Sequence, residues 1–131
     1  MGNKSIVKVA AMLATLPFCG FAIAEEHTSE SLEHATKAVD SAGDSKALGE
    51  HAAEALKHIE AAKAAQASHP GIVKQLNKGE ADLRSAMKNA SQFNTDTASR
   101  DAMDAKTHLN AADTAARRLE AIKTQPKPAN K

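Results

Sequence analysis

The apolar positions of the chain recur at helical spacing in four separate stretches. Each stretch carries a stripe of leucine, isoleucine, valine and many alanines, with charged side chains between them. No run alternates strictly between apolar and polar residues, so the pattern predicts helices and no strands. The expected helices cover residues 29–42, 46–67 and 70–90, and a last stretch that ends near Lys123.

Short breaks separate these helices. Gly43 is expected to end the first helix, and Asp44 or Ser45 can cap the second. Pro70 suits the first turn of the third helix because proline lacks the N–H group that is unpaired at that position. Four helices with short connections predict an all-α fold, an antiparallel up-down four-helix bundle.

The core of this bundle is expected to be thin, because alanine fills many inward positions and buries little apolar area. The inward stripes are expected to reach Ala42 in the first helix and Ile122 in the fourth, and Thr95 or Asp96 is expected to cap the fourth. Gly79 should weaken the middle of the third helix by about 1 kcal/mol relative to alanine.

The first 24 residues have the composition of a secretion signal. Lys4 and Lys8 precede an apolar run at residues 9–23, and Ala22-Ile23-Ala24 is a small-x-small cleavage site. The run is too short and too interrupted by proline and glycine to predict a membrane span. The predicted organisation is a cleaved signal peptide at 1–24, a four-helix bundle at 25–123 and a disordered tail at 124–131.

Export without disulfides is typical of a bacterial periplasmic protein, because cleavage would remove Cys19, the only cysteine. It would also remove two lysines, so the formal net charge of +1 becomes −1. A near-neutral mature chain has no electrostatic reason to bind nucleic acid, and no membrane span is expected in it. With one aromatic residue and no Cys-x-x-Cys-His sequence, it is expected to hold neither haem nor a nucleotide.

One eight-residue pattern occurs twice. Residues 27–34 read HTSESLEH, and residues 51–58 read HAAEALKH. On a helix, offsets of three, four and seven place imidazole, carboxylate and imidazole on one stripe. Divalent transition metals bind these groups well. The candidate metal ligands are therefore His27, Glu30 and His34 from the first copy and His51, Glu54 and His58 from the second.

A single copy cannot enclose an ion with both of its histidines, because they lie about 10.5 Å apart along the helix axis. If the chain reverses at Gly43, His34 faces His51 and His27 faces His58. The two stripes then lie either in one shared groove or on two opposite flanks, depending on the handedness of the bundle. A shared groove would hold two sites, one at each pair of facing histidines.

A fainter echo of the pattern occurs in the fourth helix, where Asp101, Asp104 and His108 keep the offsets of three and four. His108 is therefore a further candidate metal ligand. The third helix has no histidine, and its Glu80 and Asp82 are expected to be ordinary surface acids.

The HAAEALKH copy, the looser HTSESLEH copy and the secretion signal together resemble the small metal-binding protein family of exported bacterial proteins. This resemblance implies an alanine-rich four-helix bundle in the periplasm that binds divalent metals, copper above all, through surface histidines. The second hairpin keeps only His108 of the histidines that the family pattern would place there. The chain is therefore expected to hold fewer ions than a member with a full set.

The leading hypothesis is a periplasmic protein that sequesters or buffers divalent transition-metal ions. Histidine and carboxylate suit Cu(II), Ni(II) or Zn(II), and the general order of complex stability favours Cu(II). The alternative is a non-catalytic helical module that binds a protein partner or another copy of itself, with incidental histidines; the sequence identifies no such partner. No arrangement of nucleophile and base predicts an enzyme.

Overall fold

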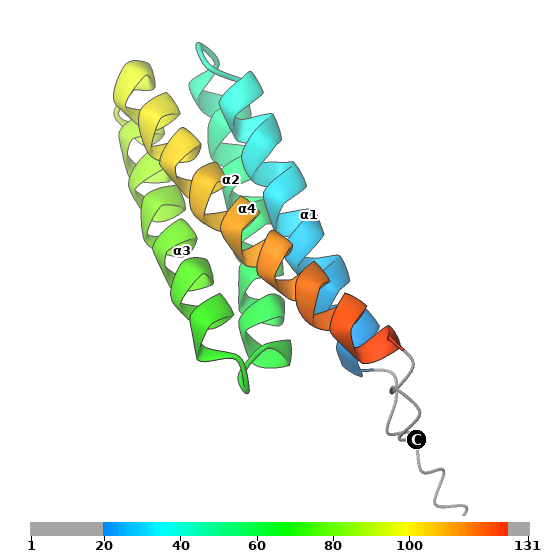
Figure 1. The fold of residues 1–131 in the computed structure, drawn as a ribbon. Helices are drawn as coiled ribbons and strands as arrows, with labels where there is room; N and C mark the ends of the chain where they lie inside the picture. The colour runs from blue at the N-terminus through cyan, green and yellow to red at the C-terminus, as the bar shows by residue number, and fades with distance from the viewer. Residues whose placement is uncertain (1–19, 126–131) are drawn as a thin grey trace, which may run out of the picture.

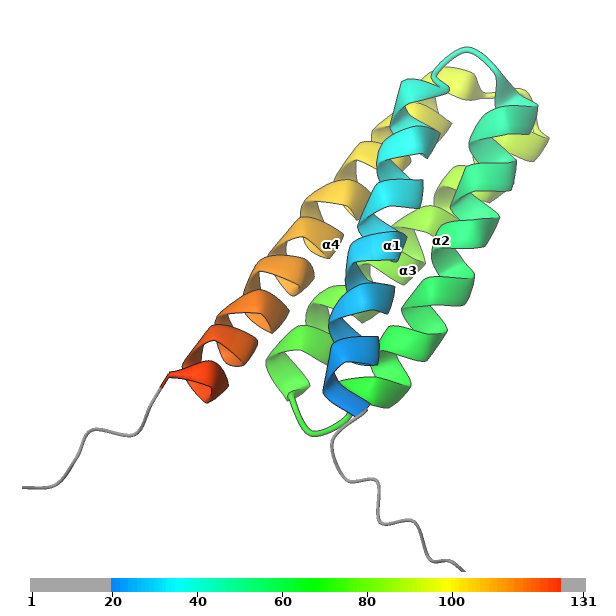
Figure 2. The same cartoon turned by 90° about the vertical axis from the view of Figure 1, so that its right-hand side faces the viewer.

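The structure, a computed structural model, describes residues 20–125, which form four helices packed side by side (Figure 1). The first hairpin consists of α1 (Gly20–Asp40) and α2 (Ser45–Ala65), and the second of α3 (Pro70–Ser91) and α4 (Thr95–Thr124). The connections within the two hairpins lie at one end of the molecule, and the α2–α3 connection lies at the other (Figure 2). This architecture confirms the predicted all-α, up-down four-helix bundle.

Three residues shape the helix connections as the sequence predicted. Gly43 has a φ of 102°, a left-handed conformation that glycine adopts without steric cost. The Asp44 side chain caps α2 by accepting hydrogen bonds from the N–H groups of Lys46 and Ala47. Pro70 lies in the first turn of α3. These residues set the connections that align α2 with α1 and α3 with α2.

Two helix starts differ from the prediction. The N-cap position of α4 is Asn94, so the predicted cap at Thr95 or Asp96 is wrong. The chain turns at Phe93, whose φ is 57°, and α4 begins directly after this turn. α1 already begins at Gly20, inside the predicted signal peptide, because no proline or glycine follows to interrupt it. Residues 1–19 and 126–131, which hold most of the predicted signal peptide and tail, lie outside the described residues.

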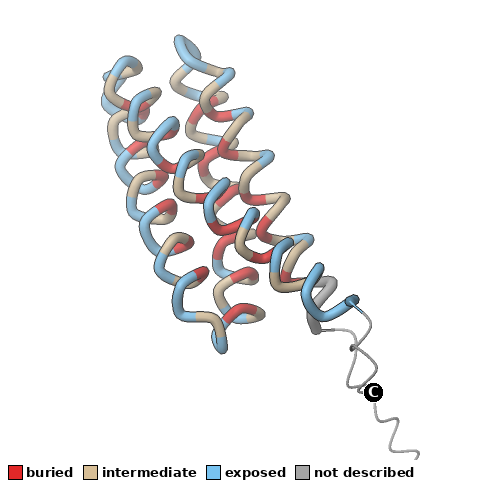
Figure 3. The backbone as a smooth tube through the Cα atoms, in the orientation of Figure 1, coloured by how far each residue is buried: buried red, intermediate tan, exposed pale blue. Residues whose placement is uncertain are grey.

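The core runs as a buried strip along the facing sides of the helices (Figure 3). Alanine occupies most of the buried apolar positions, as the sequence predicts. Two predicted inward positions are wrong. Ala42 is exposed because α1 has already ended at Asp40, and Ile122 is 67 % exposed in the last turn of α4. The largest fully buried apolar side chains are Leu48, Ile59, Leu76, Leu83 and Leu109.

Gly79 has a packing role that the sequence did not reveal. A Cβ atom at this position would lie 2.9 Å from both Cγ and Cδ2 of Leu109, whose side chain is fully buried. The missing side chain therefore lets the leucine of α4 pack directly on the backbone of α3.

The prediction that Glu80 is an ordinary surface acid is wrong. Its side chain is only 16 % exposed and accepts hydrogen bonds from Lys63 of α2 at 2.6 Å and from Arg84 at 2.7 Å. These bonds lower the pKa of Glu80, and the Glu80 carboxylate raises the pKa of Lys63. The pair links α2 to α3.

Among residues 20–125, no helix combines the length and apolar character needed to cross a membrane.

Candidate metal centre

The two His/Glu stripes lie in one shared groove between α1 and α2. Ring centroids are 5.7 Å apart for His27 and His58 and 6.2 Å apart for His34 and His51. The rings of His34 and His58 are stacked, with centroids 5.4 Å apart and planes inclined by 11°. The four side chains form one continuous line, the imidazole row, in the order His27, His58, His34, His51. Of the two arrangements that the sequence left open, the bundle therefore adopts the shared groove.

Small side chains bring the two stripes together. Ala35 and Ala38 of α1 and Ala52 and Ala55 of α2 are fully buried. Because alanine extends only one carbon from the backbone, the two helices approach closely along this seam. The histidines flank the alanines and meet across the groove, so the spacing of the repeat and the small core residues together build the imidazole row.

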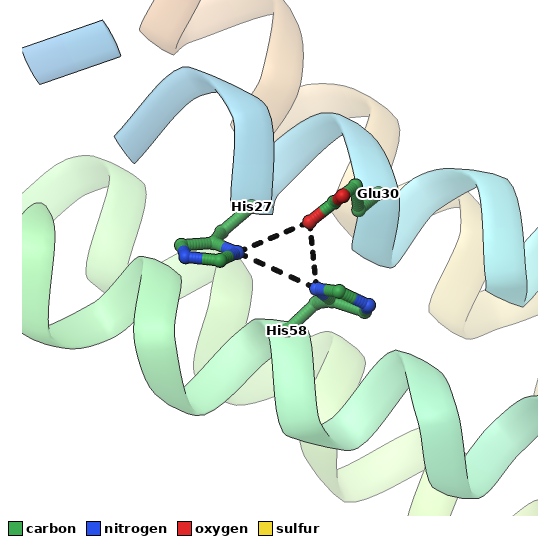
Figure 4. A group of neighbouring side chains, drawn as sticks. All are labelled: His27, Glu30 and His58. Carbon is green, nitrogen blue, oxygen red and sulfur yellow. Dashed lines mark hydrogen bonds and ion pairs between the residues drawn. The ribbon is translucent and has the colours of Figure 1, made fainter. Parts of the chain in front are cut away.

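Three donor atoms converge at one end of the row (Figure 4). Glu30 Oε2 lies 3.1 Å from His27 Nδ1 on the same helix and 2.8 Å from His58 Nδ1 on α2. The two Nδ1 atoms are 3.4 Å apart. Metal–ligand bonds of about 2 Å at square-planar or tetrahedral angles separate donor atoms by roughly 2.8–3.3 Å. This group, the triad, therefore already has the spacing of the ligands of a bound ion.

The triad is accessible from solvent. The side chains of His27, Glu30 and His58 are 30 %, 38 % and 23 % exposed, respectively. An open depression beside Glu30 is also lined by Glu25, Glu26, Ser29, Glu33 and Arg117. The three additional carboxylates make this entrance predominantly negative, which favours the approach of a cation.

The sequence comparison agrees with this geometry. The profile of the family described as small metal-binding protein matches residues 2–112, which is most of the chain. The chain belongs to the small metal-binding protein family. No curated protein and no solved structure matches it. Family membership and the triad both point to metal ions as ligands, and the resemblance predicted from the two repeat copies is confirmed.

In this family member, His34 is held in the form that metals bind. Its Nδ1 atom is buried and has no hydrogen-bond partner among the described residues. Burial lowers the pKa of His34, and the neighbouring His58 lowers it further. The imidazole is therefore neutral near pH 7, and a neutral imidazole nitrogen offers its lone pair to a metal.

Glu54 makes a different set of contacts from Glu30. Its carboxylate accepts a hydrogen bond of 2.6 Å from Lys57 Nζ, and this bond lowers the pKa of Glu54. His34 and His58 are close enough to lower that pKa slightly further. Among the described residues, the triad is the one group of three metal-capable side chains whose donor atoms all lie within 4.8 Å of one another. The roles of His34, His51 and Glu54 as ligands stay predictions.

His108 lies on the other hairpin, in the seam between α3 and α4. Its Nδ1 atom is 3.0 Å from Gln75 Oε1, and its Nε2 atom is 3.8 Å from Asp82 Oδ2. Asp82 is thus half-buried, and burial raises its pKa while His108 opposes the shift. The sequence did not single out Gln75, because only the register of α3 against α4 brings it to His108. The assignment of His108 as a metal ligand stays a prediction.

Proposed function

We propose that this protein is a periplasmic metal-binding protein that sequesters or buffers divalent transition-metal ions, with Cu(II) as the preferred ion. The observation that carries the proposal is the convergence of two imidazole nitrogens and one carboxylate oxygen at distances of 2.8–3.4 Å, from two different helices. Without an ion, an Nδ1–H group of either histidine can donate to Glu30. A metal ion at Nδ1 would require each imidazole to be neutral with its proton on Nε2, so the affinity should fall when these histidines become protonated.

The donor set supports the choice of ion. Two imidazoles and a carboxylate suit Cu(II), Ni(II) and Zn(II), and for a given site of this kind the affinity is highest for Cu(II). Cu(I) would need thiolate or thioether ligands, but residues 20–125 contain no cysteine, and the triad includes no methionine. We therefore expect Ni(II) and Zn(II) to occupy the same site with lower affinity.

The openness of the site supports buffering rather than a permanent structural metal. The triad side chains are partly exposed and supply three ligands, so a bound ion would keep at least one coordination position for solvent. Structural zinc sites, in contrast, are usually closed by four protein ligands. A cation on the triad can therefore exchange with solvent or with another carrier. The family description likewise names metal binding and no reaction.

The periplasmic location rests on the secretion signal in the sequence. Cleavage after Ala24 would leave α1 beginning at Glu25, with the whole triad retained. Glu25 and Glu26 would then lie in the first turn, where negative side chains interact favourably with the helix dipole. Intact-mass measurement of protein released from the periplasm checks this, and the expected N-terminal residue is Glu25.

Calorimetric titration with Cu(II) near neutral pH tests the metal site. The double variant His27→Gln/His58→Gln should lose the tightest binding event, because it removes two of the three ligands and even supporting residues are often worth ten- to a hundredfold in affinity. The control is His69→Gln/His108→Gln, which removes the same number of imidazoles outside the imidazole row. This control should bind the tightest ion as the wild type does. Equal and weak binding by all three proteins would contradict the proposal and favour the helical interaction module.

A further inference from the structure

The imidazole row has two ends that are related by the symmetry of the first hairpin. Two antiparallel copies of one sequence pattern exchange places under a local two-fold rotation, which maps the first copy onto the second. Under this operation His27 maps onto His51, and Glu30 maps onto Glu54. The triad therefore has a counterpart at the other end of the row, made of His34, His51 and Glu54.

The counterpart has comparable components. Its two facing imidazoles have ring centroids 6.2 Å apart, against 5.7 Å in the triad. The buried Nδ1 atom of His34 has no hydrogen-bond partner in the described part of the chain. The carboxylate of Glu54 lies close enough to His34 for their charges to influence each other. Two imidazoles and a carboxylate are thus present at this end as well, with their donor atoms further apart than the 4.8 Å within which those of the triad lie.

One residue makes the two ends differ. The seventh position of the repeat is Glu33 in the first copy and Lys57 in the second. Lys57 Nζ lies 2.6 Å from Glu54 Oε1, so the ammonium group holds this carboxylate. Glu33 cannot bind a carboxylate and pairs with Lys37 at 2.6 Å instead. Glu30 is consequently left to bond both imidazoles of the triad.

We propose that His34, His51 and Glu54 form a second, weaker metal site and that Lys57 sets its affinity by competing for the Glu54 carboxylate. This inference rests on the proposed function, because it extends metal binding from one end of the row to the other. An ion entering the second site must displace the ammonium group from Glu54 and remain close to its positive charge. The triad therefore fills first, and Lys57 determines how much later the second site fills.

Calorimetric titration with Cu(II) alone resolves the two binding events. Lys57→Gln should tighten the second event by about three- to fivefold, the range expected when an exposed ion pair no longer competes. The first event should stay unchanged. The matched control is Lys46→Gln, which removes the same charge from another exposed ion pair of α2, the pair with Glu50. That variant should leave both events as they are in the wild type.

Two further variants locate the events. His51→Gln should remove the second event and keep the first. Glu33→Lys places a lysine three residues after Glu30, as Lys57 follows Glu54, and should weaken the first event by a similar factor of about three to five.

Each contrary result overturns a distinct statement. A second event that survives in His51→Gln would overturn the second site. Equal behaviour of Lys57→Gln and Lys46→Gln would overturn the role of Lys57. Both results leave the triad and the proposed function standing. Absence of any binding to the wild type would overturn the proposed function itself and this inference with it.

Discussion

The two hairpins share one architecture but differ in what they bury and what they present. The second hairpin contributes three of the largest fully buried apolar side chains, Leu76, Leu83 and Leu109. Over residues 24–40, the part of α1 whose burial is described, the buried residues are alanines and two small hydroxyl residues, Thr28 and Ser31, whose hydroxyl groups bond to the backbone of α1. The first hairpin instead carries the whole imidazole row.

This difference shows how the fold separates stability from ligand chemistry. Large side chains at the α3–α4 seam stabilise the bundle without help from the groove. Over residues 24–40, α1 has no fully buried large side chain, so small-residue packing and the contacts of His27 and Glu30 with His58 contribute more to its position against α2. An ion that bridges the two helices would add a further link between α1 and α2.

The largest expected effect on the free energy of unfolding comes from a substitution in the second hairpin. Leu109→Ala should lower the free energy of unfolding by about 2–5 kcal/mol, because it removes a buried side chain and leaves a cavity. His58→Gln, on the first hairpin, should cost less than about 1 kcal/mol without metal, since its side chain is partly exposed. Urea unfolding followed by helical circular dichroism measures both. Similar losses from the two substitutions would break the contrast between the hairpins.

Metal binding should stabilise the first hairpin more than the second. Free Cu(II) at a hundred times its dissociation constant should raise the free energy of unfolding by about 2.7 kcal/mol. The same addition should raise it by clearly less in His27→Gln/His58→Gln, which keeps only the weaker second site. Hydrogen exchange should show the slowing of amide exchange concentrated in α1 and in the part of α2 around His58. Equal slowing throughout α3 and α4 would contradict a site confined to the first hairpin.

Two glycines, one in each hairpin, sharpen the comparison. Replacing them by alanine should change the stability of the protein in opposite directions. Gly49 of α2 has open space where a Cβ atom would lie, so Gly49→Ala should stabilise the protein by about 0.5–1 kcal/mol. At Gly79 of α3 the new Cβ would press against buried Leu109, and overpacking costs about 1–3 kcal/mol. Thermal unfolding of the metal-free proteins should therefore rank Gly49→Ala above wild type and Gly79→Ala below it. Stabilisation by both substitutions would show that Leu109 can move aside.

The smallest expected effect is a pH dependence at His34. Its pKa is lowered in the folded protein, while the unfolded chain should have the ordinary value of about 6.5. The unfolded chain therefore takes up a proton first as pH falls below about 6.5, and the free energy of unfolding decreases. The decrease continues until the pH passes the folded pKa. Metal-free His34→Gln should show a shallower decline over this range, and parallel curves would contradict the burial of this imidazole.

The sequence predicted what depends on local pattern. The four helices, the Asp44 cap, the turn at Gly43 and the pairing of His27 with His58 follow from periodicity and from the reversal of the chain. The choice of the shared groove could not be predicted, because it depends on the handedness of the bundle.

Features that depend on how side chains compete across helices were also not predicted. The sequence pattern treats Glu30 and Glu54 as equivalent, but Lys57 holds only Glu54. The contact of Gly79 with Leu109 and the burial of Glu80 beside Lys63 require the register of neighbouring helices. The start of α1 and the cap of α4 differ because helix-forming residues and the turn at Phe93 set these boundaries.

The most direct measurement of the central claim is the response of the imidazole nitrogens to Zn(II), a diamagnetic ion that suits the same donors. In proton–nitrogen spectra recorded with ¹⁵N-labelled histidine, the first equivalent of Zn(II) should shift the Nδ1 resonances of His27 and His58. The resonances of His69 and His108 should stay in place. Shifts that appear first at His69 or His108, or no shift at His27 and His58, would contradict a metal centre at the triad.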